Sequence, residues 1–319
     1  MPRLRPLIAI GVVASSLACG SDPTEDPSET GAGTEAPVGP FDTDIFIADL
    51  HWELGGLPSI GEPTNITRRP GYDNQPYWVP DGSGLWYTAI DELDGQADIW
   101  RYDLDGGRVT RVTASNPESE YSATPLPDGS GISTIRVEAD ETQRLWRFDT
   151  DGSNASVILE GVAPVGYHAW VDETTVVMFV LGSPATLQRG DTRTGRAQVL
   201  AENIGRSIQP IPNSHDVSYV QRNEDGTTTI MRLPGNGGDA LQLIDGIEGG
   251  DFHAWASDRV LLMAHESIVY AASPGMGGSW EPVADFSSLH LSISRLAVSP
   301  DRSQIAIVAE PSAIDLGGS

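Results

Sequence analysis

Lysine is absent from this sequence, so all 19 of its basic residues are arginines. Without lysine, the chain has no lysine Schiff base, no Walker A phosphate-binding loop and no catalytic lysine. Basic residues are also few, because 45 aspartates and glutamates bring the formal charge to −26 and the pI to about 4.3. A chain this acidic lacks the clustered positive charge that binds nucleic-acid phosphates, so no nucleic acid is expected as a partner.

Cysteine occurs once, as Cys19, which excludes a disulfide within the chain and a thiolate metal cluster. Aromatic residues make up only 7% of the chain, but a hydrophobic content of 39% is enough for a core. The 35 glycines and 23 prolines favour many turns over long helices. This composition predicts an all-β fold.

The first residues have the pattern of an export signal. Arg3 and Arg5 precede the apolar run of residues 7–18, which ends in small residues directly before Cys19. The run is shorter than the roughly 20 residues that span a bilayer. Residues 1–18 resemble a bacterial lipoprotein signal, and the resemblance implies a lipidated Cys19 and a periplasmic or cell-surface lipoprotein, anchored in the outer membrane. An ordinary secretory signal is the alternative, and it also predicts export.

Residues 19–43 have the composition of a linker. They are acidic, contain no basic residue, and otherwise consist mostly of glycine, proline, serine, threonine and alanine. Such a segment buries too little apolar surface to fold, so we expect a disordered, self-repelling tether. Residues 311–319 are expected to form a disordered tail, which leaves residues 44–310 for the folded domain.

A repeat of about 45 residues organises this domain. The clearest copy spans residues 73–113, where four short runs rich in β-branched and aromatic residues are separated by the turn formers Pro-Asp-Gly and Asp-Gly-Gly. This pattern indicates a four-stranded antiparallel meander. Further copies begin near residues 122, 167, 207 and 252, and this spacing is typical of propeller blades.

The two ends of the domain supply parts of one further blade. Residues 295–301 and 304–308 match the first two strands of the repeat, while residues 44–49 and 64–67 match the third and fourth. A blade completed from both termini closes the ring and pairs strand edges that would otherwise aggregate. Together with the five whole copies, it predicts a six-bladed β-propeller with four-stranded antiparallel blades.

Three motifs of the clearest copy resemble the WD-type repeat of TolB-like β-propellers. They are Gln75-Pro76-Tyr77-Trp78-Val79-Pro80-Asp81-Gly82, Asp98-Ile99-Trp100 and Arg111-Val112-Thr113. The resemblance covers nearly all of residues 44–310 and implies the same ring-shaped fold.

In a ring of meanders, the loops that enter each first strand lie on one face, together with those that join second and third strands. Polar, aromatic and titratable side chains should therefore gather at one mouth of the central channel, where a ligand site is expected. The ligand-binding residues predicted there are Asn74, Glu120, Tyr121, Tyr167, His168, Arg206, His253 and Arg295.

Several of these residues allow two interpretations. His168 and His253 are either hydrogen-bonded structural residues or, with Glu120 and Asn74, ligands of a divalent cation such as zinc or manganese. Arg206 either binds a carboxylate or phosphate or neutralises nearby acids. The tryptophans at equivalent repeat positions, Trp78, Trp170 and Trp255, are interpreted as wedges between blades.

The sequence contains neither a Gly-x-Ser-x-Gly nucleophile elbow nor a His-Glu-x-x-His zinc motif, so no catalytic residue is assigned. The leading hypothesis is a membrane-tethered binding or scaffolding module of the bacterial cell envelope, with a protein, peptide or glycan at the channel face. The alternative is a metal-dependent hydrolase, similar to the lactonases of this ring type, whose cofactor is a divalent cation in the channel. A structural envelope component without a specific ligand is the third hypothesis.

The lipoprotein hypothesis predicts that Cys19→Ser releases the protein from membranes, because the acyl chains contribute about 0.8 kcal/mol for each buried methylene. Membrane and soluble fractions of cells that express the two forms provide the measurement. Unchanged membrane association of the variant would contradict lipidation at this residue.

Overall fold

The computed structural model describes residues 42–53, 56–91, 95–275 and 278–310. The predicted signal peptide, nearly all of the predicted tether and the predicted tail lie outside the described residues. Regular structure in the described part is almost entirely β-strand, with one 3-10 turn, η1 (Ser287–Leu289). No helix in that part has the length and apolar character needed to cross a membrane.

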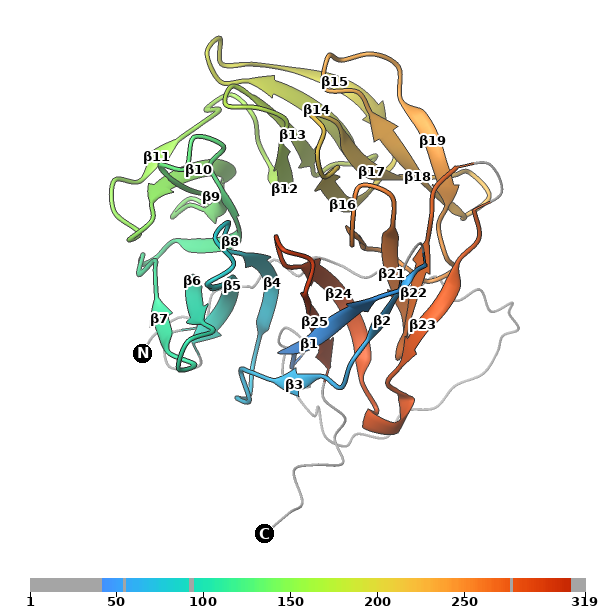
Figure 1. Cartoon of the computed structure of the whole chain (residues 1–319). Coiled ribbons are helices and arrows are strands. Elements are labelled where there is room, and N and C mark those ends of the chain that lie inside the picture. Colours follow the sequence, from blue (N-terminus) through green and yellow to red (C-terminus); the bar gives the residue numbers. More distant parts are fainter. Residues whose placement is uncertain (1–41, 54–55, 92–94, 276–277, 311–319) are drawn as a thin grey trace, which may run out of the picture. The chain divides into compact units, whose positions relative to one another are not determined.

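The strands form six antiparallel sheets arranged as blades around a ring (Figure 1). Blade 1 contains β4 (Asp73–Trp78), β5 (Gly84–Asp91), β6 (Gln96–Asp103) and β7 (Val109–Arg111). Blade 2 contains β8 (Ser119–Pro125), β9 (Gly131–Val137), β10 (Gln143–Asp149) and β11 (Ser156–Val157). Blade 3 contains β12 (Val165–Trp170), β13 (Thr175–Val180), β14 (Thr186–Asp191) and β15 (Arg196–Glu202).

The other blades follow the same order. Blade 4 contains β16 (Ile204–Pro210), β17 (Val217–Arg222), β18 (Thr228–Leu233) and β19 (Leu241–Asp245). Blade 5 contains β20 (His253–Trp255), β21 (Leu261–His265), β22 (Ile268–Ala272) and β23 (Glu281–Asp285). Blade 6 contains β24 (Ser292–Val298), β25 (Gln304–Glu310), β1 (Asp44–Trp52), β2 (Pro58–Ile60) and β3 (Thr64–Asn65). The predicted six-bladed β-propeller is confirmed.

The turn between the first two strands of blade 1 has a local cause. The carboxylate of Asp81 accepts a hydrogen bond of 2.9 Å from the backbone N–H of Ser83, and Gly82 adopts the left-handed φ of 74°. An aspartate that bonds to the backbone two residues later, followed by glycine, is a typical tight turn. Blade 2 repeats it at Asp128 and Gly129, so the Pro-Asp-Gly pattern was correctly assigned to turns.

The hydrophobic core is divided among the junctions between neighbouring blades. The described residues contain six clusters of buried apolar side chains, one at each junction. Between blades 6 and 1, Ile45 and Val308 pack with Trp78 and Leu85. Each blade is therefore stabilised mainly by its neighbours, and the stability of the whole depends on closing the ring.

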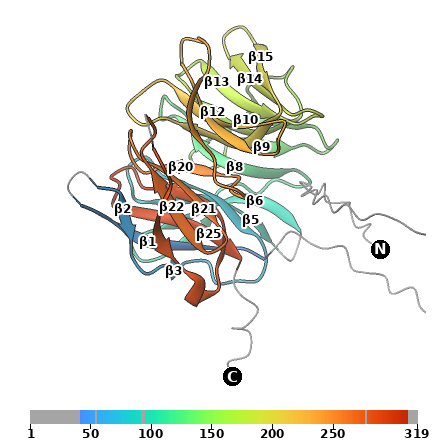
Figure 2. The ribbon, with the colours of Figure 1, turned by 90° about the vertical axis from the view of Figure 1, so that its right-hand side faces the viewer.

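Blade 6 is built from both ends of the domain, as predicted. Strand β1 pairs with β25 from Asp44 opposite Ala309 to Asp49 opposite Gln304. Strand β3 pairs with the other edge of β1, and Figure 2 shows β1 and β3 beside β25. The structure adds β2, which pairs with the end of β1 beyond its contact with β25 and was not expected from the sequence.

Deletion of residues 41–70 should therefore leave one edge of the buried strand β25 without a partner and produce an aggregating protein, because an exposed apolar strand edge recruits other chains. Light scattering after size-exclusion chromatography measures the outcome. Deletion of residues 2–40, which leaves β1 intact, is the matched control and should give a monodisperse protein. A folded monomer that lacks residues 41–70 would contradict the composite blade.

Candidate functional site

The first strand of every blade lies at the centre of the ring, and several of these inner strands are irregular. The pairing register shifts in β4, β8, β12, β16 and β24, as it does at β-bulges. Gln75 and Ser122 adopt left-handed φ values of 57° and 55° within the shifts of β4 and β8. Bulges and such strained residues redirect side chains and occur frequently beside functional sites.

A cavity of about 90 Å³ opens at this centre. Its lining comes from the inner strands of all six blades and from Phe252, which directly precedes β20. Five of the eight predicted ligand-binding residues line it, namely Tyr167, His168, Arg206, His253 and Arg295. The volume suits water molecules or the end group of a larger ligand.

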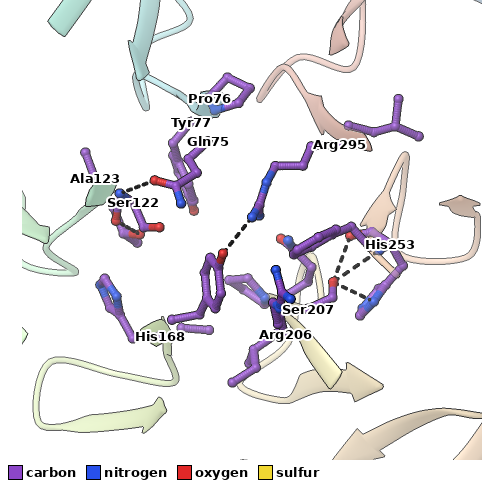
Figure 3. Close-up of a pocket in the computed structure, with 18 residues that line it drawn as sticks. Gln75, Pro76, Tyr77, Ser122, Ala123, His168, Arg206, Ser207, His253 and Arg295 are labelled. Carbon is purple, nitrogen blue, oxygen red and sulfur yellow. Dashed lines mark hydrogen bonds between the residues drawn. The ribbon is translucent and has the colours of Figure 1, made fainter. Parts of the chain in front are cut away.

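Arg295 crosses the centre of the ring from blade 6 (Figure 3). Its guanidinium donates a hydrogen bond of 2.7 Å to the hydroxyl of Tyr167 in blade 3 and lies 3.7 Å from the centre of the Phe252 ring. The Tyr167 ring in turn meets the Phe252 ring edge to face. This cation–π and hydrogen-bond arrangement fixes one positive charge in the cavity.

His253 is held by two serines of blade 4. Its Nδ1 lies 2.9 Å from Ser207 Oγ, and its Nε2 lies 2.7 Å from Ser218 Oγ. Complete burial lowers its pKa to about 3, so the ring stays neutral at ordinary pH. The Ser207–His253 distance resembles that of a nucleophile and its base, but a base with so low a pKa and no carboxylate partner does not activate a hydroxyl.

His168 occupies the same position in blade 3, and its Nε2 lies 2.7 Å from Ser133 Oγ of blade 2. Burial lowers its pKa to about 3 as well. The hydrogen-bonded interpretation thus fits both nitrogens of His253 and the Nε2 of His168. The tryptophan wedges are confirmed, because each indole N–H donates to the preceding blade: Trp78 to the carbonyl of Ala297, Trp170 to Ser133 Oγ and Trp255 to Ser218 Oγ.

Asn74, Glu120 and Tyr121 lie on the inner strands but do not line the cavity. The side-chain oxygen of Asn74 accepts a bond from the backbone N–H of Gln75. Glu120 is fully buried, 3.2 Å from the guanidinium of Arg136, and burial raises its pKa to about 7 although Arg136 lowers it.

The alternative in which His168, His253, Glu120 and Asn74 hold one divalent cation is therefore wrong. His168 and His253 bind serines at the cavity, whereas Glu120 and Asn74 make their contacts elsewhere. Within the described ranges, no group of three or more histidine, cysteine, aspartate or glutamate side chains could hold a metal ion. The hydrolase alternative thus has no such side-chain cluster for its cation in that part of the chain.

Sequence reasoning missed Gln75, Ser122 and Phe252, which also line the cavity. Ser122 could have been found by aligning the repeats, because Ser122 and Ser207 each lie three residues before a proline that ends the first strand. A second cavity, of about 340 Å³, was missed as well. It lies where the first strands end, on the face of the Pro-Asp-Gly turns, and is lined mostly by apolar residues such as Leu126 and Trp170.

No family model matches the chain. An uncharacterised protein of Agrobacterium fabrum is 27% identical over 107 residues, which are 31% of this chain and 36% of that protein. A tricorn protease homologue of Streptomyces coelicolor is 24% identical over 237 residues, which are 69% of this chain and 20% of that protein. The chain thus spans about a third and a fifth of these two relatives.

Solved structures agree with the fold. A putative TolB from Agrobacterium tumefaciens superposes with a TM-score of 0.65 at 16% identity, over 86% of this chain and all of that one. The fold is a TolB-like six-bladed β-propeller. TolB from Acinetobacter baumannii gives a TM-score of 0.56 at 12% identity, over 84% of this chain and 64% of that one. A chain of a nidogen–laminin complex gives 0.59 at 13% identity, over 84% and 98%.

The buried histidines predict a pH-dependent stability. Such a histidine has a pKa of about 3 in the folded protein and about 6.5 in the unfolded chain. Above pH 6.5 it does not change the free energy of unfolding, and below pH 6.5 it lowers that free energy by about 1.4 kcal/mol for each pH unit. His253→Gln loses the serine bonds and should be less stable at pH 7. Only the wild type has this buried histidine, so only the wild type loses stability through it as the pH falls. The difference in free energy of unfolding between the wild type and His253→Gln should therefore shrink by about 1.4 kcal/mol for each pH unit from pH 6.5 toward pH 4.

Urea denaturation at pH 7, 6 and 5 provides the measurement. Gln198, exposed on the outer strand of blade 3 and replaced by alanine, is the control, because neither side chain titrates, and its difference from the wild type should stay constant over the same range. A deficit of His253→Gln that does not change with pH would mean that the buried ring is not held neutral.

Proposed function

We propose that this chain is an exported, membrane-tethered propeller that acts as a non-catalytic binding or scaffolding module of the bacterial cell envelope. Its partner, a protein, peptide or glycan, would bind at the channel face. The observation that carries the proposal is the convergence of all six inner strands on one cavity, where Arg295 is held by Tyr167 and Phe252. Convergent polar groups in a concave site are typical of ligand binding.

The absence of catalytic machinery at this cavity favours binding over chemistry. Among the described residues that line it, none is an aspartate or glutamate, and both histidines have a pKa lowered to about 3. General acid–base catalysis near neutral pH requires a group that titrates there. The cavity thus offers donors and positive charge that can orient a ligand, without a base to transform it.

The envelope location rests on the N-terminal residues. Arg3, Arg5 and the apolar run before Cys19 support export and lipidation, and the acidic composition of residues 19–43 suits a tether that holds the ring away from a membrane. Similarity of the fold to TolB supports the same assignment by analogy, and the nidogen–laminin neighbour is a chain from a protein complex.

Site-specific photo-crosslinking in bacterial cells that carry the gene tests the proposal. A photoreactive residue replaces Ser294, which is exposed on β24 directly before Arg295. The full-length chain should then give a discrete adduct, at least tenfold stronger than from the matched position Val199, which is exposed on the outer strand of blade 3. Equal labelling from both positions, or none from Ser294, would contradict a partner at the channel face.

A further inference from the structure

The charge of the central cavity is opposite to that of the chain. The chain carries 45 acidic residues, yet the cavity is lined by Arg206 and Arg295 and, among the described residues, by no aspartate or glutamate. Elsewhere, several arginines pair with carboxylates, as Arg144 does with Glu138. Arg295 forms no ion pair with any described carboxylate and instead contacts Tyr167 and Phe252. Its positive charge is therefore available to an anion that enters the cavity.

A serine and a histidine occupy equivalent positions at two junctions of the ring, but their hydrogen bonding differs. At the junction of blades 4 and 5, Ser207 Oγ and His253 Nδ1 are hydrogen-bonded at 2.9 Å. At the junction of blades 2 and 3, Ser122 Oγ and His168 Nδ1 are both buried, and neither has a hydrogen-bond partner among the described residues. Both residues line the cavity. Among the buried polar atoms without a partner in the described part, these two belong to residues that line the cavity, so they are candidates for contacts with a ligand.

The hydrogen bonds around Ser133 bear on which of these atoms donate. Ser133 Oγ accepts the indole N–H of Trp170 at 2.9 Å, and it lies 2.7 Å from His168 Nε2 and 3.2 Å from the carbonyl oxygen of Thr124. In the arrangement where the Ser133 hydroxyl donates to the closer of these two acceptors, Nε2, the neutral imidazole carries its proton on Nδ1. In that tautomer, His168 Nδ1–H and the Ser122 hydroxyl are two donors, and the cavity that both residues line also holds Arg295 and, among the described residues, no carboxylate.

We propose that this cavity binds a carboxylate group, which accepts hydrogen bonds from Ser122 and His168 in the positive field of Arg295 and Arg206. The proposal rests on the proposed function and deepens it, because a carboxylate is the anion that an unmodified polypeptide presents. Charge-assisted bonds from guanidinium to carboxylate are among the strongest hydrogen bonds in proteins. The small volume of the cavity suits one end group, with the rest of the ligand in the channel mouth.

Nitrogen NMR of the histidine rings tests this in the full chain. The probe is N-acetylglycylglycine, with its C-terminal amide as the uncharged control and acetate as the free small acid. The Nδ1 resonance of His168 should shift on addition of the acid and not of the amide. His253 is an internal control, because both of its nitrogens already contact serines. If the dissociation constant from this titration is at least tenfold lower for the peptide acid than for acetate, the carboxylate comes from a polypeptide terminus. If it is lower for acetate, the ligand is a small acid.

Two variants locate the site. Arg295→Gln should lower the affinity for the peptide acid at least tenfold. Arg259→Gln, at an exposed arginine, should leave this affinity unchanged. If Arg295→Gln does not fold, Ser122→Ala provides the same comparison at a single hydroxyl. Equal binding of acid and amide, an equal response to inorganic phosphate, or unchanged affinity in a folded Arg295→Gln would each overturn the proposal.

The outcome is separable from that of the crosslinking experiment. Adducts from Ser294 without a His168 shift would keep the binding module and reject the carboxylate site. A His168 shift without adducts would keep the carboxylate site and reject the partner at the channel face.

Discussion

The pairing of β1 with β25 is the contact on which the rest of the structure depends. Each junction between blades holds its own cluster of apolar side chains, so no blade has a complete core alone. Six backbone positions, from Asp44 opposite Ala309 to Asp49 opposite Gln304, convert a row of five blades into a closed ring. Closure is also what brings Arg295 of blade 6 within 2.7 Å of Tyr167 in blade 3.

The inner strands serve both stability and recognition. On their blade-facing side, Trp170 and Trp255 bond to serines of the preceding blade and hold the junctions together. On the channel side, the register shifts turn Ser122 and Gln75 toward the cavity. The structure therefore uses one set of strands for two purposes, and the irregular residues are those that face the channel.

Most of the fold could be predicted from the sequence, because the blade repeat and its turns are local patterns. Pro80, Asp81 and Gly82 show the turn chemistry directly, and the composite blade followed from counting strands. The site was harder to predict. Glu120 and Ser122 are two residues apart, and only the bulge in β8 decides that Ser122 lines the cavity while Glu120 does not. The contact between Arg295 and Tyr167 joins residues 128 positions apart, which no local pattern reveals.

The position of β1 within its sheet has a mechanical consequence. This strand lies between β25 and the short strands β2 and β3, with backbone hydrogen bonds on both edges. A pull on the chain at residue 42 enters the ring through β1, where the load is shared among the bonds of two edges. A pull on residue 42 is thus resisted where β1 closes the ring. A pull that detaches β1 would therefore also open the ring.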